Sequence, residues 1–264
     1  MCFDDDSRPP IAPMAGGGLD SSRLVLTAAD GNRLAAFEAR ALDATGAAIL
    51  ILPDVRGLHP YYEELALRFA EHGFDAIAID YFGRTAGAEP RAESFEYMPH
   101  VRQLTWPGTQ ADIRAGIDQI RSRGTTPDRL FSIGFCMGGR LSFLAATLGG
   151  GFEGVIGFYG RVVGPHPSGS PAPAELTGKM HGRVLALFAG DDEGIPPADV
   201  AAFERALADA GLEHRVLTYP DTPHSFFDRK ASQYAEQSAA AWSEILEFVR
   251  RETAPREGIA RLIS

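Results

Sequence analysis

The residue whose type and setting most strongly suggest chemistry is Cys136, in the segment Gly134-Phe135-Cys136-Met137-Gly138-Gly139. The segment follows a short apolar run, 130–133, and precedes an apolar stretch of helical period. This pattern predicts a strand, a sharp turn and a helix, as in the nucleophile elbow G-x-S-x-G with Cys in place of Ser. The thiol is expected above the sheet, at a helix N-terminus that favours the reactive thiolate. The alternative is a buried Cys that packs as a small apolar side chain.

A nucleophile of this kind needs a base, and along an elbow-containing chain the order is nucleophile, acid, histidine. Of the seven histidines, His224 is the one that follows the last predicted strand. The turn after the preceding predicted strand carries Asp191 and Asp192. Both turns are expected beside the elbow, because the carboxyl ends of parallel strands share one edge of a sheet. A histidine in a loop is commonly structural or solvated, but its coincidence with an elbow and an acidic turn favours His224 as the base.

The surrounding sequence predicts the elements that position these residues. Apolar runs flanked by Gly, Pro and Asp alternate with longer helical segments, which indicates an α/β fold with a mostly parallel sheet of about eight strands and helices on both faces. We expect a single domain over 1–264, with an N-terminal extension at 1–21 and a C-terminal tail at 253–264. The predicted strands are 23–27 and 34–38, as an antiparallel start, then 48–52, 76–79, 130–133, 154–158, 184–188 and 214–219. The predicted helices are 61–71, 109–122, 137–148, 197–210 and 234–250.

Two long segments, 81–108 and 160–182, fit neither element and follow predicted strands, where open α/β sheets bind ligands. They are expected to form walls of a substrate pocket. Aromatic side chains in these and neighbouring turns would narrow the pocket and arginines would hold an anionic group, with core packing and solvation as the respective alternatives. The candidates for this pocket are Arg56, His59, Phe82, Arg84, Tyr97, Arg102, Trp106, Tyr159 and Phe226.

Composition and charge argue against several classes of function. The chain has 35 Asp and Glu against 25 Lys and Arg, a net charge of −10, which leaves no electrostatic footprint for nucleic acid. An acidic start and the lack of a long apolar run predict a cytoplasmic protein without membrane contact. Two cysteines provide no disulfide framework. No phosphate loop, H-E-x-x-H or C-x-x-C occurs, so no cofactor and no metal is expected, and the protein is expected to be a monomer or a small homo-oligomer.

The chain resembles the dienelactone hydrolase family through three segments in the right order: GFCMGG, the acidic turn DDEGIPP and the turn PHSFF. The resemblance spans roughly 49–249. The hexapeptide is its most specific part, because most α/β-hydrolases have Ser at that position. The resemblance implies an α/β-hydrolase fold and the hydrolysis of a small ester or lactone.

The resemblance also implies residue roles. Cys136 would be the nucleophile and His224 the general base and acid. Asp192 would orient the imidazole, and not Asp191, because the family turn has its acid four residues before a proline, here Pro196. Neighbouring residues do not normally point the same way, so one of the two carboxylates is expected to fill the role.

Further roles and one departure follow from the same comparison. Asp54 would match the acidic residue that contacts the resting thiol, the alternative being a solvated loop carboxylate. The backbone N–H groups of Val55 and Met137 would form the oxyanion hole. In dienelactone-cleaving members an Arg four residues after the catalytic His helps hold the substrate carboxylate. Here that position is Asp228, with Arg229 one residue further on as a possible pocket residue, so dienelactone itself is not implied as the substrate.

The expected reaction is attack by Cys136 on a carbonyl, an acyl-thioester intermediate, and water activated by His224. Two alternatives stay open. The first is an acyltransferase or thioesterase that uses the same triad, because the fold does not decide which acceptor takes the acyl group. The second is a non-catalytic or redox-sensing thiol protein, against which His224 and the acidic turn argue.

Overall fold

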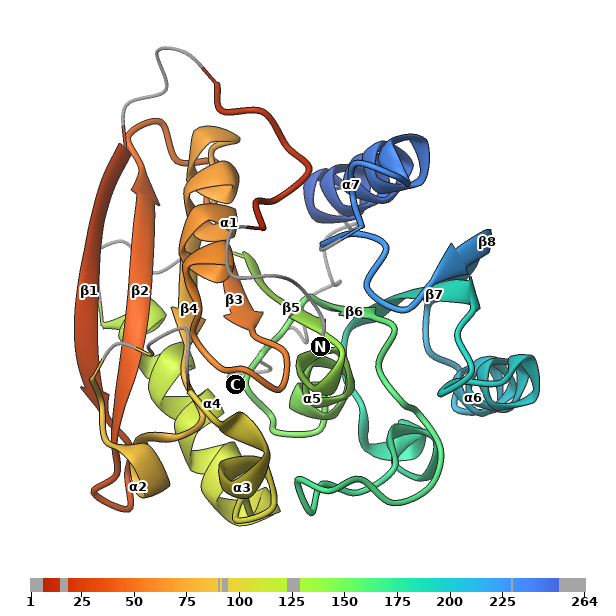
Figure 1. The fold of residues 1–264 in the computed structure, drawn as a ribbon, viewed down its shortest axis with the longest axis horizontal. Coiled ribbons are helices and arrows are strands. Elements are labelled where there is room, and N and C mark those ends of the chain that lie inside the picture. The colour runs from red at the N-terminus through yellow and green to blue at the C-terminus, as the bar shows by residue number, and fades with distance from the viewer. Residues whose placement is uncertain are drawn as a thin grey trace, which may run out of the picture.

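The computed structural model describes residues 7–14, 19–89, 91, 95–122, 129–228 and 230–251. Across them runs an eight-stranded sheet in the order β1-β2-β4-β3-β5-β6-β7-β8 (Figure 1). β1 pairs antiparallel with β2, β2 pairs antiparallel with β4, and the remaining strand pairs are parallel. The expected α/β class with an antiparallel start is therefore confirmed. The strands are β1 (Leu19–Thr27), β2 (Arg33–Ala41), β3 (Ala47–Leu52), β4 (Asp75–Ile79), β5 (Arg129–Phe135), β6 (Gly154–Phe158), β7 (Arg183–Asp191) and β8 (His214–Pro223).

The sheet lies between two layers of helices, which is why its central strands read as continuous apolar runs. Helices α1 (Pro60–Glu71) and α7 (Ala235–Arg250) share one face, where the rings of Phe69 and Trp242 lie 5.0 Å apart. Helices α4 (Trp106–Arg121), α5 (Met137–Ala145) and α6 (Pro197–Asp209) cover the other face (Figure 1). β3 is buried along its whole length, and so is β6.

The segment 81–108 contains more regular structure than its sequence predicts. It includes two short helices, α2 (Gly83–Ala86) and α3 (Tyr97–Val101), and the first turn of α4. α4 begins at Trp106, three residues before the predicted start, because the Thr105 side chain accepts a hydrogen bond from the N–H of Gly108. The second segment, 160–182, holds two short 3-10 turns, η1 (Pro173–Glu175) and η2 (Thr177–Lys179).

The ends of the chain depart from expectation in one place. β1 begins at Leu19, inside the predicted extension 1–21, and pairs there with Ala41 of β2. The start of this strand was not predicted because its residues 20–23 are polar and exposed to solvent, so they carry no apolar signal. Residues 1–6, 15–18 and the predicted tail at 253–264 lie outside the described residues. Among the described helices, none combines the length and the apolar character that crossing a lipid bilayer requires.

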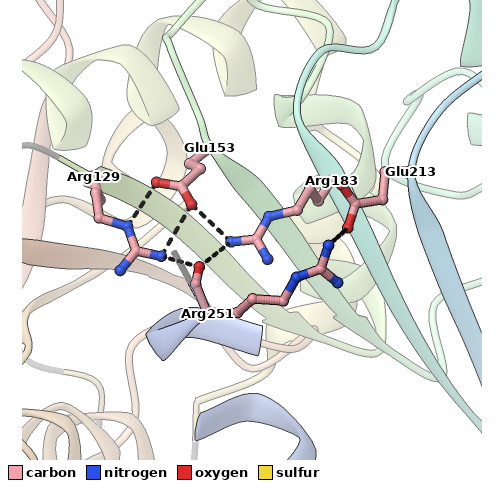
Figure 2. Close-up of polar contacts among 5 residues, drawn as sticks. All are labelled: Arg129, Glu153, Arg183, Glu213 and Arg251. Atoms are coloured by element: carbon pink, nitrogen blue, oxygen red, sulfur yellow. Dashed lines mark hydrogen bonds and ion pairs between the residues drawn. The ribbon is translucent and has the colours of Figure 1, made fainter. Parts of the chain in front are cut away.

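A network of arginines and glutamates holds the C-terminal end of α7 against the sheet (Figure 2). Glu153 accepts hydrogen bonds from Arg129 and Arg183, each at 2.8 Å. Arg129 also donates to the main-chain oxygen of Arg251, and the Arg251 guanidinium pairs with Glu213. Burial opposes ionisation of Glu153, but the bonds from Arg129 and the charges of both arginines outweigh it and hold the pKa of Glu153 below its usual range. Since helix C-termini attract cations, this arrangement stabilises the docking of α7.

Candidate active site

Cys136 sits in a strained turn between β5 and α5. Its backbone has φ 55° and ψ −116°, a conformation that residues other than glycine rarely adopt. Such strain persists where the surroundings fix it. Here the Cys136 N–H donates to the oxygen of Phe158 on β6, and the Cys136 oxygen accepts from the N–H of Arg140 on α5. This is the geometry of a nucleophile elbow, with the thiol only partly buried.

The glycines of the elbow are required by close backbone contacts. A Cβ at Gly138 would lie 2.0 Å from the oxygen of Leu52 at the end of β3. A Cβ at Gly134 would lie 1.9 Å from the oxygen of Gly138. The first turn of α5 can therefore press against β3 and β5 only because both positions lack side chains.

His224 and Asp192 form a close pair at the neighbouring strand ends. The Nδ1 atom of His224 lies 2.6 Å from Oδ2 of Asp192, and the other Asp192 oxygen accepts from the N–H of Gly194 at 2.9 Å. The Asp192 side chain is 5% exposed and the His224 side chain 34%. Asp191, in contrast, is exposed to solvent. The structure thus places Asp192, and not Asp191, against the imidazole.

A cavity of about 250 Å³ joins these groups at the carboxyl ends of β5, β6, β7 and β8. Tyr159, which has φ 34°, stands beside the imidazole, with its ring centre 4.7 Å from that of His224. A nucleophile candidate, a base candidate and its carboxylate therefore share one concave site. The residues that line it are Cys136, Met137, Tyr159, Arg161, His166, Pro167, Asp192, Gly194, Ile195 and His224.

Asp54 is fully buried, so its alternative reading as a solvated loop carboxylate is wrong. Its Oδ1 accepts from the N–H of Arg56 at 2.9 Å, and its own N–H donates to Oη of Tyr62. Nearby, burial together with the charges of Asp54, Asp80 and Cys136 raises the pKa of Tyr81 well above its usual range. The Tyr81 hydroxyl donates to the oxygen of Pro53, the residue before Asp54, at 2.9 Å. Val55 is half-buried beside Asp54 and packs against the core.

The remaining pocket candidates lie elsewhere. The Arg84 guanidinium pairs with Asp30 and Asp112, and Arg56 Nη2 lies 3.4 Å from His59 Nε2 in a buried contact. Within the described residues, none of the following lines the cavity: Arg56, His59, Phe82, Arg84, Tyr97, Arg102, Trp106 and Phe226. Phe82 and Phe226 are buried in the core, Tyr97 and Trp106 are half-buried, and Arg102 is exposed. Arg229 lies outside the described residues.

Sequence reasoning missed Arg161, His166 and Pro167, which line the cavity from the segment 160–182. The position of this segment after a strand indicated a pocket wall, but no motif singled out individual residues. Asp228, where dienelactone-cleaving members carry an Arg, is buried and accepts a hydrogen bond from Oη of Tyr159 at 2.9 Å.

The sheet order and the elbow define an α/β-hydrolase, and the comparison with known proteins identifies the branch. Residues 34–253 match the model of the Dienelactone hydrolase family, and the chain belongs to this family. It is accordingly a carboxylic ester hydrolase of the dienelactone hydrolase type, as its sequence motifs predict.

Named relatives agree with this assignment. A "Putative carboxymethylenebutenolidase" of Synechocystis sp. is 28% identical over 212 residues, which cover 77% of this chain and 85% of that protein. A protein of the same name from Escherichia coli K12 is 26% identical, covering 84% of this chain and 83% of its own length. Among solved structures, a "Putative Dienelactone Hydrolase" from Klebsiella pneumoniae superposes with a TM-score of 0.77 at 22% identity, over 89% of this chain and 100% of that one.

Proposed function

We propose that this chain hydrolyses a small ester or lactone with Cys136 as nucleophile, His224 as general base and acid, and Asp192 as the residue that orients the imidazole. The observation that carries the proposal is the 2.6 Å contact between His224 Nδ1 and Asp192 Oδ2, at a cavity that Cys136 also lines. An oriented base next to an elbow nucleophile is the arrangement that covalent acyl transfer requires.

In the proposed first step, His224 holds the proton of the Cys136 thiol and the thiolate attacks the carbonyl carbon. The new C–S bond gives a tetrahedral intermediate, which collapses as the alkoxide leaves and takes the proton from His224. The enzyme then carries an acyl-thioester. Water, deprotonated by His224, attacks the thioester, the acid leaves, and the thiolate and imidazolium are restored.

Asp192 supports both steps by accepting the Nδ1 proton, which turns Nε2 toward the reaction. The N–H groups of Met137, at the first residue of α5, and of Val55 are the proposed donors to the oxyanion. Asp54 is the proposed partner of the resting thiol, and its full burial supports a role inside the protein over that of a solvated loop carboxylate.

The size of the cavity supports a small substrate. About 250 Å³ is at or below the lower end of ordinary ligand pockets, so short acyl groups and small rings fit best. The buried carboxylate of Asp228, at the position of the family arginine, favours a substrate other than dienelactone. A reducing compartment such as the cytoplasm belongs to the proposal, because the mechanism needs Cys136 as a free thiol.

The experiment is a screen of small lactones and short-chain nitrophenyl esters with purified protein, with Cys136→Ala as the blank. Turnover by the native protein and its loss in the correctly folded Ala variant are expected. Most of the activity surviving in Cys136→Ala, with contaminating esterases excluded, would remove this thiol from the mechanism. Adding an alcohol acceptor separates hydrolysis from acyl transfer, because a transferase would yield mainly the new ester.

A further inference from the structure

The loop 161–170, which forms one wall of the cavity, is held by a buried arginine. Arg140 on α5 is fully buried, and its guanidinium donates to the main-chain oxygens of Arg161, Gly164 and Ser170 and to the Ser170 hydroxyl, at 2.8 to 3.0 Å. Among the described residues no carboxylate hydrogen bonds to it. A buried charge with neutral partners is costly to desolvate, and burial lowers the pKa of Arg140 to about 10. Arg140 lies one helical turn after Cys136, so its hydrogen bonds fix the loop against the helix that follows the nucleophile.

The fixed loop presents His166 in a defined tautomer. The backbone N–H of Ser168 donates to Nδ1 of His166 at 3.1 Å, and the Ser168 hydroxyl oxygen lies 2.9 Å from the same nitrogen. Because a backbone N–H can only donate, Nδ1 is an acceptor and the neutral ring carries its proton on Nε2. Burial, followed by the charges of Arg140 and Arg161, lowers the pKa of His166 to about 4. At neutral pH the ring is therefore an uncharged donor through Nε2.

We propose that His166 is a substrate-binding residue whose Nε2–H donates a hydrogen bond to an acceptor oxygen of the substrate other than the reacting carbonyl, and that Arg140 positions it. His166 lines the same cavity as Cys136 and His224, and Nδ1 is already turned toward Ser168, which leaves Nε2 for a ligand. This inference rests on the proposed function. It assigns to the substrate class an uncharged oxygen, such as an ether or hydroxyl, near the scissile bond.

The test uses two nitrophenyl esters that differ by one atom: butyrate and methoxyacetate, in which an ether oxygen replaces a methylene. The measured quantity is the ratio of kcat/KM for methoxyacetate to that for butyrate, which cancels general effects of a substitution on folding or on the triad. In His166→Leu the ratio should fall about 3- to 10-fold, the effect of one neutral hydrogen bond. His166→Gln, which keeps an N–H donor, should lose less.

Matched variants separate binding from structure. His181→Leu, at an exposed histidine further along the same segment, should leave the ratio unchanged. A lysine at position 140 cannot make all the hydrogen bonds of the guanidinium, so Arg140→Lys alone should lower the ratio. The double variant Arg140→Lys with His166→Leu should have the same ratio as His166→Leu alone. Alkylation of Cys136 by iodoacetamide should proceed at the native rate in His166→Leu.

An unchanged ratio in His166→Leu would overturn the inference, and so would an equal fall in His181→Leu. The inference would also be wrong if the rate of Cys136 alkylation in His166→Leu fell together with its activity, because His166 would then act on the thiol. A charged variant of the probe, the nitrophenyl monoester of succinate, distinguishes the acceptor. If only its turnover depends on His166, the residue recognises a carboxylate and the assignment of an uncharged oxygen is wrong. Failure of the proposed function itself would look different, because native protein would then hydrolyse no ester above the Cys136→Ala blank.

Discussion

Replacing Asp192 by Asn is expected to damage catalysis through the tautomer of His224. Oδ1 of Asp192 accepts from the N–H of Gly194, so an Asn at this position keeps that bond only with its oxygen on Gly194 and its amide NH2 facing Nδ1. The NH2 group is a donor, so Nδ1 must become the acceptor and the imidazole proton moves to Nε2. The ring then presents a proton, and not a lone pair, to the cavity and cannot serve as the base.

The size of the effect follows from the bond that is lost. A hydrogen bond to a charged group contributes about 1.5–3 kcal/mol, which corresponds to about a 10- to 150-fold fall in kcat. The equivalent change in a serine triad costs about 10⁴, and a smaller loss is expected here because a thiol ionises far more readily than a hydroxyl. KM should change little, because Asp192 acts through the imidazole. The assay is steady-state hydrolysis of nitrophenyl acetate, with circular dichroism to verify folding.

Asp191→Asn is the matched control, since it makes the same chemical change one residue away at an exposed side chain. It should retain kcat within about twofold, as expected for a surface substitution. If Asp191→Asn is the impaired enzyme and Asp192→Asn is close to native, the assignment of the triad acid is wrong. If both variants are close to native, neither Asp191 nor Asp192 orients His224 during the reaction.

Three further predictions address the elbow, the ion network and the pocket. Gly138→Ala should lower kcat about 100-fold and reduce Tm, because its Cβ would overlap the Leu52 oxygen and displace Cys136. Gly178→Ala, which has open space at its Cβ, should change neither quantity, and equal effects of the two substitutions would contradict the close-contact argument. Glu153→Gln should lower Tm by a few degrees at pH 7, because a carboxyl with a depressed pKa stabilises the fold above its unfolded-state pKa. The difference should shrink as the pH falls below the ordinary Glu pKa of about 4.3 and vanish once the pH is below the lower folded-state pKa. A difference that persists in strong acid would assign the effect to packing. Finally, kcat/KM should fall from acetyl to long-chain nitrophenyl esters, and a steady rise would refute the small cavity.

The fold was predictable from sequence because the central parallel strands, such as β3 and β6, are buried on both faces and therefore appear as short apolar runs. β6 was predicted with its exact bounds, 154–158, for this reason. β8 extends to Pro223, four residues beyond the predicted end, because its last four residues are two prolines, Asp221 and Thr222, which carry no apolar signal. α5 ends at Ala145, three residues before the prediction, although the apolar pattern continues into the following turn.

The predicted site residues fall into two groups, those chosen from their place in the chain order and those chosen from residue type alone. Cys136, Asp192 and His224 line one cavity because each follows a strand in a fixed chain order, and backbone topology brings such positions together. The aromatic and arginine candidates were chosen for residue type alone, and type does not specify direction. Phe82 is buried in the core, and Arg84 forms ion pairs with Asp30 and Asp112. His166 was missed because its position depends on the tertiary hydrogen bonds by which Arg140 holds the loop 161–170, and no local sequence pattern predicts them.

The most direct test of the central proposal is to detect the acyl-thioester on Cys136. Native protein would be mixed with a nitrophenyl acetate or a small lactone, quenched in acid within the first turnovers, digested and analysed by mass spectrometry. The expected result is one acyl group on the peptide that contains Cys136, removed by neutral hydroxylamine and absent from Cys136→Ala. Turnover with the acyl group on another residue, or with no acylated peptide at any quench time while ester is consumed, would contradict covalent catalysis by this thiol.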